Sequence, residues 1–366
     1  MMHPIPRPFG RSGARLPVRR GALLLGALLL ALVAWAVGLA APAGAQTVLR
    51  NMSYDATREF YAEFNVAFAQ WWERNQNEPI IIDQSHGASQ SQALAIRNGK
   101  MADVATLALA PDIELLAGAG LVPSNWRQRL PYNSSPYTST IVFLVRSNNP
   151  AGIRDWPDLL KPGLRVMLPD PRISGGGRWA WLAAWGQVLA QGGDENAARG
   201  YLGRLLPQSE LITAGARNAL ERFALQDEGD VLITWESEAL AWAAGPQGKG
   251  VSVVVPPRSI LAEPPVAVVS RFTERSGTRS AAEAYLVFLY THEGQAMAAR
   301  HYFRPRLPPL AAQEIWRFQP LELFTVDDLF GGWGNVLSRH FAPGGEFDRL
   351  LDRNRPDPVA NSDGRG

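Results

Sequence analysis

A short unit recurs four times along the chain: an apolar run, a turn of small residues, and then a segment with helical periodicity. The copies are TVLRNMSYD before ATREFYAEFNVAFAQWW, EPIIIDQSHG before ASQSQALAIRNG, GLRVMLPDPRISGGG before RWAWLAAWGQVLAQGG, and SELITAGA before RNALERFALQDEG. Strands that alternate with helices favour mostly parallel sheets covered by helices. The pattern therefore predicts an α/β fold, and it places the four strand-to-helix junctions where open α/β sheets bind ligands.

Two extended segments divide this pattern into two lobes. Residues 138–146 read TSTIVFLVR and residues 259–270 read SILAEPPVAVVS, and both are apolar stretches bracketed by Pro and Ser. We expect the chain to leave one lobe at the first segment and to return at the second, which gives two mixed, mostly parallel sheets with a ligand cleft between them. The expected divisions are a leader over 1–45, the first part of lobe I over 46–138, lobe II over 139–262, the return to lobe I with the C-terminal helices over 263–350, and a frayed tail over 351–366.

Aromatic residues recur at helical spacing in two of the predicted helices. The two stripes are Phe60, Phe64, Phe68 and Trp71 in the first helix, and Trp179, Leu182, Trp185 and Leu189 in the third. Such stripes are typical of helix faces that pack into a core. We therefore expect them to be structural and to hold no cofactor.

The first 45 residues have the pattern of a secretory signal peptide. Five arginines and no acidic residue precede the run GALLLGALLLALVAWAVGLA, and Ala43, Gly44 and Ala45 fit a small-x-small cleavage site. We expect cleavage after Ala45 and export to a bacterial periplasm. The Arg19-Arg20 pair leaves twin-arginine export open, and an uncleaved membrane anchor is the alternative because the apolar run is close to the length of a spanning helix.

The charge of the mature chain argues against nucleic acid as a partner. Removal of five leader arginines from a chain of net charge +2 leaves −3 on the remaining 321 of 366 residues. Cysteine is absent, so the fold has neither disulfides nor a lipid-modified cysteine anchor. We expect a free, monomeric protein.

Several junctions between predicted strands and helices offer hydrogen-bond donors to an anion. SGGG precedes one helix, TAGAR opens another, Ser89 follows HGA, and Asp55 stands at the first corner. N–H groups in the first turn of a helix lack partners and carry partial positive charge. Trp235, at the end of the apolar run DVLIT, adds an indole N–H that only donates.

Catalytic and metal-binding patterns are weak by comparison. The glycine run matches neither the P-loop nor the GxGxxG spacing, and no GxSxG occurs. Asp83, Ser85 and His86 have the residue types of a hydrolase triad, but neighbours on a strand point to opposite faces. No histidine stands at a metal-ligand spacing. We predict neither an enzyme nor a metal or cofactor.

Eight stretches carry a resemblance to a known family. They are NMSYDATREFY, IDQSHGASQSQA, SPYTSTIVFLVR, SGGGRWAWLAAWG, AGARNALERF, DVLITWESEA, ILAEPPVAVV and FGGWG, in this order from about residue 49 to about residue 350. They closely resemble the periplasmic sulfate-binding proteins of ABC importers, a family that includes thiosulfate binders. The resemblance implies a two-lobed type II periplasmic-binding-protein fold that holds desolvated sulfate without a contacting cation and delivers it to a membrane ABC permease.

The resemblance also implies the residues of the site. Sulfate would be held by the N–H groups of Asp55, Ser89, Gly175, Gly176 and Ala216, by the Ser89 hydroxyl and by the Trp235 indole, with Ser174 flanking the site and Arg178 and Arg217 behind the peptide dipoles. The chain departs from the family at two places. HGASQSQ replaces the common HGGSGKQ, which puts Ala88 and Gln90 beside Ser89 in place of glycines, and SGGGR replaces SGGAR, which adds Gly177.

Three alternatives remain open from the residues. The altered HGAS loop leaves another tetrahedral oxyanion, molybdate or phosphate, as the ligand. An exported hydrolase would use Ser85, His86 and a distant acid. An uncut leader would make the chain a membrane-tethered sensor subunit.

Overall fold

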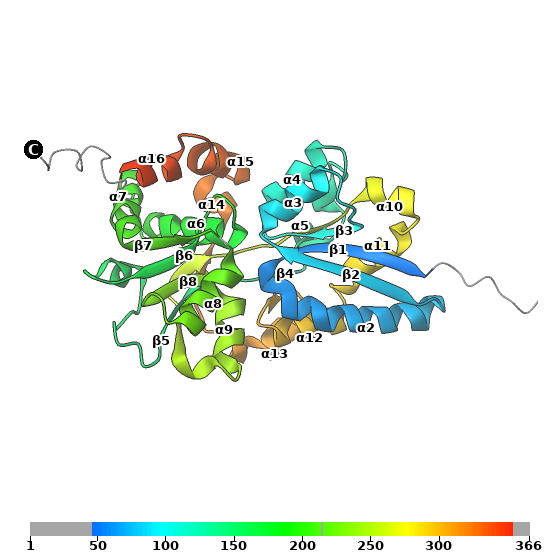
Figure 1. The fold of residues 1–366 in the computed structure, drawn as a ribbon, viewed down its shortest axis with the longest axis horizontal. Helices are drawn as coiled ribbons and strands as arrows, with labels where there is room; N and C mark the ends of the chain where they lie inside the picture. The colour runs from blue at the N-terminus through cyan, green and yellow to red at the C-terminus, as the bar shows by residue number, and fades with distance from the viewer. Residues whose placement is uncertain (1–45, 214, 354–366) are drawn as a thin grey trace, which may run out of the picture. The chain divides into compact units, whose positions relative to one another are not determined.

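The computed structural model describes residues 46–213 and 215–353 (Figure 1). The expected signal peptide lies outside these residues. The last described helix, α16 (Glu346–Arg353), reaches three residues into the segment expected to be a frayed tail, and residues 354–366 lie outside. None of the helices among residues 46–213 and 215–353 has the length and apolarity needed to span a membrane.

The first sheet has four strands in the order β11-β3-β1-β2. Strand β1 runs parallel to both β2 and β3, whereas β11 is antiparallel to β3. The strands are β1 (Thr47–Tyr54), β2 (Ile80–Gly87), β3 (Val104–Thr106) and β11 (Val266–Val268).

The second sheet has five strands in the order β7-β6-β8-β5-β9. Strand β6 is parallel to β7 and β8, and β5 is antiparallel to β8 and β9. The strands are β5 (Ile141–Arg146), β6 (Val166–Pro169), β7 (Ser209–Ile212), β8 (Val231–Trp235) and β9 (Val251–Val254). Both sheets are mixed and mostly built from the predicted units, so the α/β prediction is confirmed.

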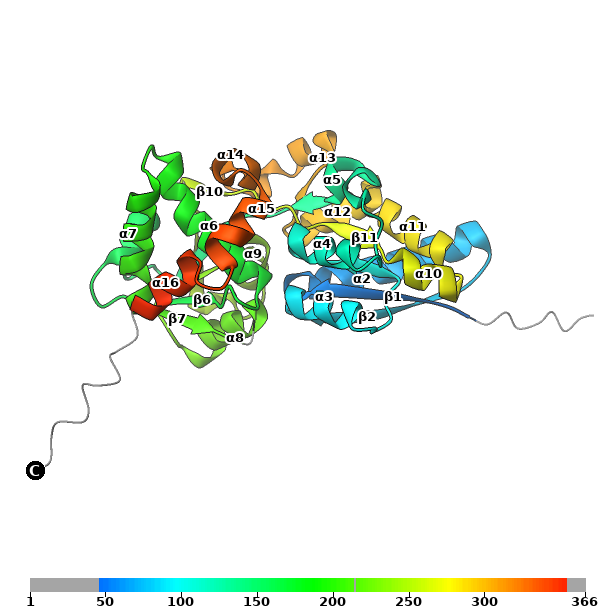
Figure 2. The same cartoon turned by 90° about the horizontal axis from the view of Figure 1, so that it is seen from above.

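The helices flank the two sheets in two groups (Figures 1 and 2). The helices near the first sheet are α2 (Arg58–Gln76), α3 (Ser89–Arg97), α4 (Ala110–Gly118), α5 (Pro131–Ser134), α10 (Ser270–Ser276), α11 (Arg279–Phe288) and α12 (His292–Arg300). Those near the second sheet are α6 (Gly175–Ala190), α7 (Glu195–Leu205), α8 (Ala216–Gln226), α9 (Glu236–Ala244), α14 (Val326–Phe330), α15 (Trp333–Val336) and α16, while α13 (Pro308–Gln313) follows the short strand β12 (Arg304–Pro305).

The short 3₁₀ and π segments connect these elements. They are η1 (Asp55–Thr57), η2 (Trp126–Gln128), η3 (Trp156–Leu160), η4 (Leu206–Gln208), η5 (Gly248–Gly250), η6 (Ile315–Arg317) and η7 (Leu337–Phe341). Each of the four predicted strand-to-helix units is present: β1 to α2, β2 to α3, β6 to α6 and β7 to α8.

The chain passes between the two sheets three times. The first passage separates β4 (Tyr137–Thr138) from β5, and the second separates β10 (Arg258–Ile260) from β11. These two passages are joined by backbone hydrogen bonds between Ser139 and Ala262, at 3.0 and 2.9 Å. The third runs from β12, which pairs with β4, to β13 (Glu322–Phe324), which pairs with β10.

A buried ion pair lies close to these passages. Arg304 of β12 donates two hydrogen bonds of 2.7 Å to the carboxylate of Glu236, which is fully buried at the start of α9. A bidentate pair of this kind is directional as well as strong. It fixes the end of the second sheet's helix layer to the strand that begins the third passage.

Both predicted aromatic stripes lie in cores. In α2, Phe64 and Phe68 are buried against Tyr285 and Phe288 of α11, and Phe60 is buried in the same cluster. Trp71 packs at the margin of this cluster. In α6, Trp179, Leu182 and Trp185 are buried and Leu189 is partly buried. Helix α6 is buried on all sides from Gly175 to Gln187 because it lies between the second sheet and the C-terminal helices.

The C-terminal helices pack mainly on α6 and α7 (Figure 2), while Trp333 of α15 also packs at the margin of the first sheet's core. Arg199 of α7 binds both carboxylate oxygens of Glu346 at 2.8 and 2.7 Å, and Trp181 of α6 contacts Phe347 edge to face. Within the range predicted as the return to lobe I with the C-terminal helices (263–350), α10 to α12 lie near the first sheet, and α14 to α16 lie near the second. The third passage was not visible in the sequence, because β12 has two residues and β13 three.

His340 ties η7 to α6 in its neutral form. The Trp181 indole donates to His340 Nδ1 at 3.2 Å, and burial, reinforced by Arg339, lowers the pKa of the imidazole to about 4. A histidine whose pKa is lowered by folding stabilises the fold fully above about pH 6.5, and this contribution is lost as the pH falls toward 4.

We predict that the wild-type protein loses about 2 to 3 kcal/mol of unfolding free energy between pH 7 and pH 4 relative to His340→Gln, which keeps an acceptor for Trp181 and does not titrate. Urea unfolding at a series of pH values measures the difference. Parallel pH profiles for the two proteins would contradict the assignment.

Candidate functional site

A small pocket lies where the first turns of helices from both sheets meet. Its volume is about 10 Å³, on the scale of one water molecule or one compact ion. The lining residues are Tyr54, Asp55, Ala56, Gly87, Ala88, Ser89, Ala108, Ser174, Gly175, Gly176, Ala216 and Trp235. The six residues predicted to hold the ligand and the flanking Ser174 are brought together here, although they come from five separate parts of the chain.

Backbone N–H groups at helix starts form most of this pocket. Asp55 begins η1, Ser89 begins α3, Gly175 begins α6 and Ala216 begins α8. First-turn N–H groups have no carbonyl partner within their own helix and carry partial positive charge. The pocket therefore offers an anion neutral donors that converge from both sheets.

At each of the three glycines that begin α6, an added Cβ would crowd a different neighbour. A Cβ on Gly175 would stand 2.6 Å from the Cβ of Ala108, which belongs to the other half of the pocket. A Cβ on Gly176 would stand 2.6 Å from the Trp235 Nε1, and one on Gly177 would stand 2.3 Å from the carbonyl oxygen of Pro169. The glycine run thus lets the helix start approach the opposite lobe, the indole and its own preceding strand at once.

The indole of Trp235 is oriented by packing. It is 1% exposed, lies at the end of β8 and stacks obliquely on Tyr54 of β1, with 5.7 Å between ring centroids. Its N–H has no acceptor among the residues that the structure describes, and Nε1 is the atom nearest to a Cβ placed on Gly176. This places a rigid donor with no acceptor capacity at the pocket wall.

The two serines of the pocket have different roles from those expected. The Ser89 hydroxyl donates to the carboxylate of Asp112 at 2.5 Å and accepts from the Ala108 N–H at 2.9 Å, so only the N–H of Ser89 is left for a ligand. Ser174 caps α6 by accepting from the Gly177 N–H at 3.3 Å. Its own hydroxyl hydrogen has no acceptor in the described part of the chain and is available for a further hydrogen bond.

Asp112 was not anticipated from the sequence. It lies in the first turn of α4, is 3% exposed, and has a pKa raised to about 6 by burial, against the opposing effects of the Ser89 hydrogen bond and Arg178. The only signal in the sequence was an acidic residue directly after Pro111 in the mostly apolar stretch ALAPDIELLA, which also holds Glu114. Asp112 fixes the Ser89 side chain and thereby the first turn of α3.

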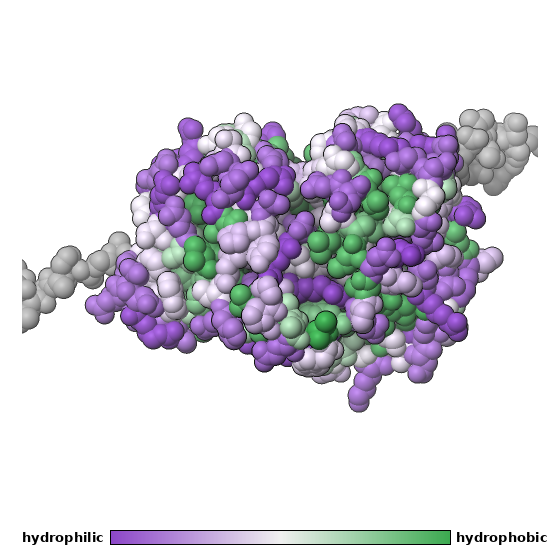
Figure 3. Space-filling view, turned by 180° about the vertical axis from the view of Figure 1, so that it is seen from behind, coloured by the Kyte–Doolittle hydropathy of each residue, from purple (hydrophilic) through white to green (hydrophobic). Residues whose placement is uncertain are grey.

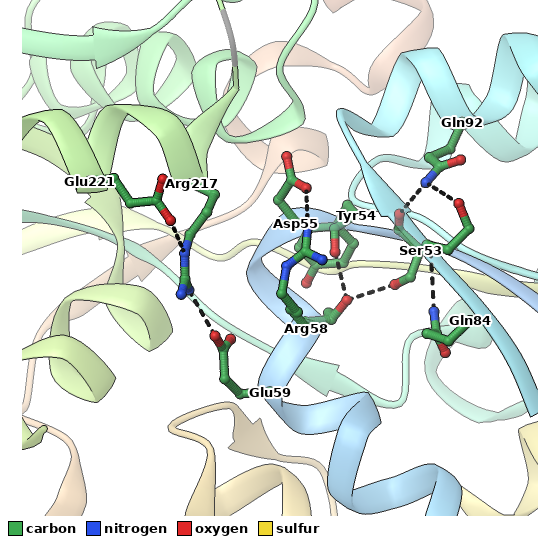
Figure 4. Close-up of polar contacts among 11 residues, drawn as sticks. Ser53, Tyr54, Asp55, Arg58, Glu59, Gln84, Gln92, Arg217 and Glu221 are labelled. Carbon is green, nitrogen blue, oxygen red and sulfur yellow. Dashed lines mark hydrogen bonds and ion pairs between the residues drawn. The ribbon is translucent and has the colours of Figure 1, made fainter.

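No positive side chain lines the pocket, within the residues described. Arg178 is buried behind the start of α6 and donates to the Pro171 carbonyl at 3.0 Å. Arg217 points away to Glu221 of its own helix and to Glu59 of α2, as Figure 4 shows. Both arginines therefore lie behind the pocket, as the resemblance implied.

The acidic groups near the pocket are neutralised in different ways. Burial raises the pKa of Asp55 while Arg58, 3.3 Å from its carboxylate, opposes that shift (Figure 4). Glu238 follows Trp235 in α9 and is buried, which raises its pKa to about 8 although Arg217 acts in the opposite direction. Glu238 is thus largely protonated at neutral pH and adds little negative charge beside an anion.

The described residues do not form the Ser–His–acid arrangement that the hydrolase alternative requires. Ser85 and His86 are neighbours in β2, and Gln92 donates to the Ser85 hydroxyl at 3.3 Å. Burial lowers the pKa of His86 to about 4, and its Nε2 has no partner among the described residues. Over residues 46–213 and 215–353, no group of three or more His, Cys, Asp and Glu side chains is placed to hold a metal ion.

The fold and the pocket define a class: two-lobed solute-binding proteins of the type II fold, which are not enzymes. The family of bacterial extracellular solute-binding proteins matches residues 49–304, and the chain belongs to this family.

Named relatives cover nearly the whole chain. The sulfate-binding protein of Escherichia coli K12 is 46% identical over 87% of this chain and 99% of its own length. The thiosulfate-binding protein of Pseudomonas aeruginosa PAO1 is 45% identical over 88% of this chain and 98% of its own length. Among solved structures, the sulfate-binding protein SubI of Mycobacterium tuberculosis H37Rv superposes with a TM-score of 0.74 at 34% identity, covering 81% of this chain and all of the other.

The glycine contacts generate a prediction for the pocket. Gly176→Ala places a methyl group against the Trp235 indole, so we expect anion affinity to fall at least about tenfold while the fold is retained. Tryptophan fluorescence titration measures it. Gly200→Ala is the matched control, because Gly200 is exposed in α7 and an added Cβ meets nothing within 4 Å. Equal affinities in the two variants would contradict this geometry.

Proposed function

We propose that this protein captures sulfate in the pocket and delivers it to a membrane ABC permease. The observation that carries the proposal is a pocket walled by donors: the N–H groups of Asp55, Ser89, Gly175, Gly176 and Ala216, the Ser174 hydroxyl and the Trp235 indole. The similarity to sulfate-binding and thiosulfate-binding proteins supports this ligand class.

The donor set favours a fully ionised oxyanion. Sulfate has no proton to donate near neutral pH, so every contact with an N–H or O–H group is matched. Hydrogen phosphate carries an O–H that needs an acceptor, and the one carboxylate that lines the pocket, Asp55, is paired with Arg58. An unpaired buried hydroxyl costs about 1 to 3 kcal/mol, which is enough to discriminate between the two anions.

The contacts across the pocket support capture by closure. Donors from the first sheet (Asp55 and Ser89) and from the second (Gly175 and Trp235) reach the same ion only when the two halves are together. Closure excludes water and strengthens each N–H to oxygen bond in the lower local dielectric. Binding energy and domain closure are therefore coupled through the same hydrogen bonds.

The location of the protein is part of the proposal. We infer that residues 1–45 are a signal peptide and that the mature, monomeric protein acts in the periplasm, supported by the basic leader and the Ala43-Gly44-Ala45 site. The intact mass of the exported protein is expected to match a chain beginning at Gln46. A full-length mass in the membrane fraction would instead support the tethered alternative.

Calorimetric titration tests the ligand. Residues 46–366, unfolded to remove bound ions and refolded, are expected to bind one sulfate per chain and to show no heat with phosphate at neutral pH. Thiosulfate and molybdate are titrated in parallel, because thiosulfate differs from sulfate in one terminal atom. Preference for phosphate or molybdate, or silence toward all four anions, would overturn the sulfate assignment.

The two serines provide an internal control for the same titration. Ser174→Ala removes a donor that is free to reach the ligand, and we expect about a tenfold loss of sulfate affinity. Ser89→Ala removes the bond to Asp112 but keeps the backbone donor, so its larger effect should be on unfolding free energy.

A further inference from the structure

Gln90 lies in the first turn of α3, directly after the pocket residue Ser89, and is half-buried. With its amide oriented to satisfy both neighbours, Gln90 Nε2 donates to the carbonyl oxygen of Arg172 at 2.6 Å. Arg178 Nη2 then donates to Gln90 Oε1 at 3.2 Å. One side chain of the first lobe thus holds two groups of the second.

The groups that Gln90 contacts belong to the glycine loop. Arg172 lies two residues before Ser174, and Arg178 directly follows the glycine run. Arg178 is 7% exposed, its Nε donates to Pro171, and its guanidinium lies 5.1 Å from the centre of the Phe341 ring. Burial lowers the pKa of Arg178, and the Gln90 carbonyl supplies an uncharged acceptor for this cation.

These bonds differ from the other contacts between the two halves in their position. The ion pair of Arg217 with Glu59 crosses at the first turn of α2, where the Glu59 side chain is 53% exposed and the attraction is weakened by water. The Trp179 indole donates to the Ala108 carbonyl at 3.0 Å from deep inside α6. Gln90 is bonded to both ends of the loop whose backbone forms the pocket wall, and it is adjacent to Ser89 in the chain.

We propose that Gln90 acts as a latch: its two hydrogen bonds hold the lobes together and thereby set the dissociation rate of the bound anion. The proposal rests on the proposed function, because a latch acts only if an anion is held in this pocket. Separation of the lobes breaks both Gln90 bonds, while an anion entering an open cleft meets neither. Gln90 therefore acts on the dissociation rate and leaves the association rate nearly unchanged.

The test compares two substitutions at this position. Gln90→Met keeps the length of the side chain and loses both hydrogen bonds, and Gln90→Ala removes the side chain as well. Stopped-flow tryptophan fluorescence with sulfate, at equal temperature and salt, gives the two rate constants. We expect both variants to release sulfate about tenfold faster, since hydrogen bonds to a charged group are the stronger kind, with association changed less than about twofold.

Gln191→Ala is the matched control. Gln191 caps the other end of α6 and donates to Gln187 at 3.0 Å, so its loss removes a glutamine hydrogen bond of the same helix away from the pocket. We expect wild-type rate constants for this variant. A thermal melt of each variant without anion separates a general loss of stability from an effect on release.

Each outcome decides between the two proposals. Wild-type protein that binds sulfate while Gln90→Met releases it at the wild-type rate would overturn the latch and leave the function standing. Equal changes in association and dissociation would also overturn it, because they indicate a distorted pocket. Failure of the wild-type protein to bind sulfate, thiosulfate, phosphate or molybdate would overturn the function and the latch together.

Discussion

The closest backbone approach in the pocket is the constraint on which the rest of the site depends. The first turn of α6 touches Ala108 of the other half, the Trp235 indole and the end of its own strand β6, and each contact leaves no space for a Cβ. Glycine at positions 175 and 176 permits the approach to the other half and to the indole, and Gly177 avoids crowding against Pro169. Donor convergence and closure over the ligand follow from this one geometric requirement.

The charged side chains near the pocket do not act on a bound anion directly. In the part of the chain described, no cationic side chain lines the pocket, and the acidic groups are paired or protonated. Arg58 faces Asp55, burial holds Glu238 largely protonated, and Arg178 and Arg217 stand behind the helix starts. A neutral donor set avoids the strong charge–charge attraction that a lysine or arginine would exert on any anion. A pocket lined by donors discriminates among anions by whether they only accept hydrogen bonds. This agrees with the proposed preference for an ion that carries no proton.

The sequence predicted the units of the fold better than their connections. The four strand-to-helix units were visible because each has a local signature: an apolar run, small residues and a helix start. The full set of pocket residues was predicted from the family resemblance. The third passage between the sheets was not visible, since two- and three-residue strands have no periodicity to detect. The exchange of roles between Ser89 and Ser174 was equally hidden, because it depends on Asp112, which is distant in the chain and close only in the folded protein.

The three passages between the sheets have a mechanical consequence. A single linker would leave the two halves free to rotate about several axes. Three neighbouring passages resist twisting and sliding. The first two are joined by hydrogen bonds between Ser139 and Ala262, and the third begins at Arg304, which is paired with Glu236 of α9. The relative motion that these passages still allow is a hinge bending of the two halves about one axis. Under the proposed closure, the two halves of the pocket would meet in the same relative position each time, so a ligand only a few ångströms across would contact atoms from both sides.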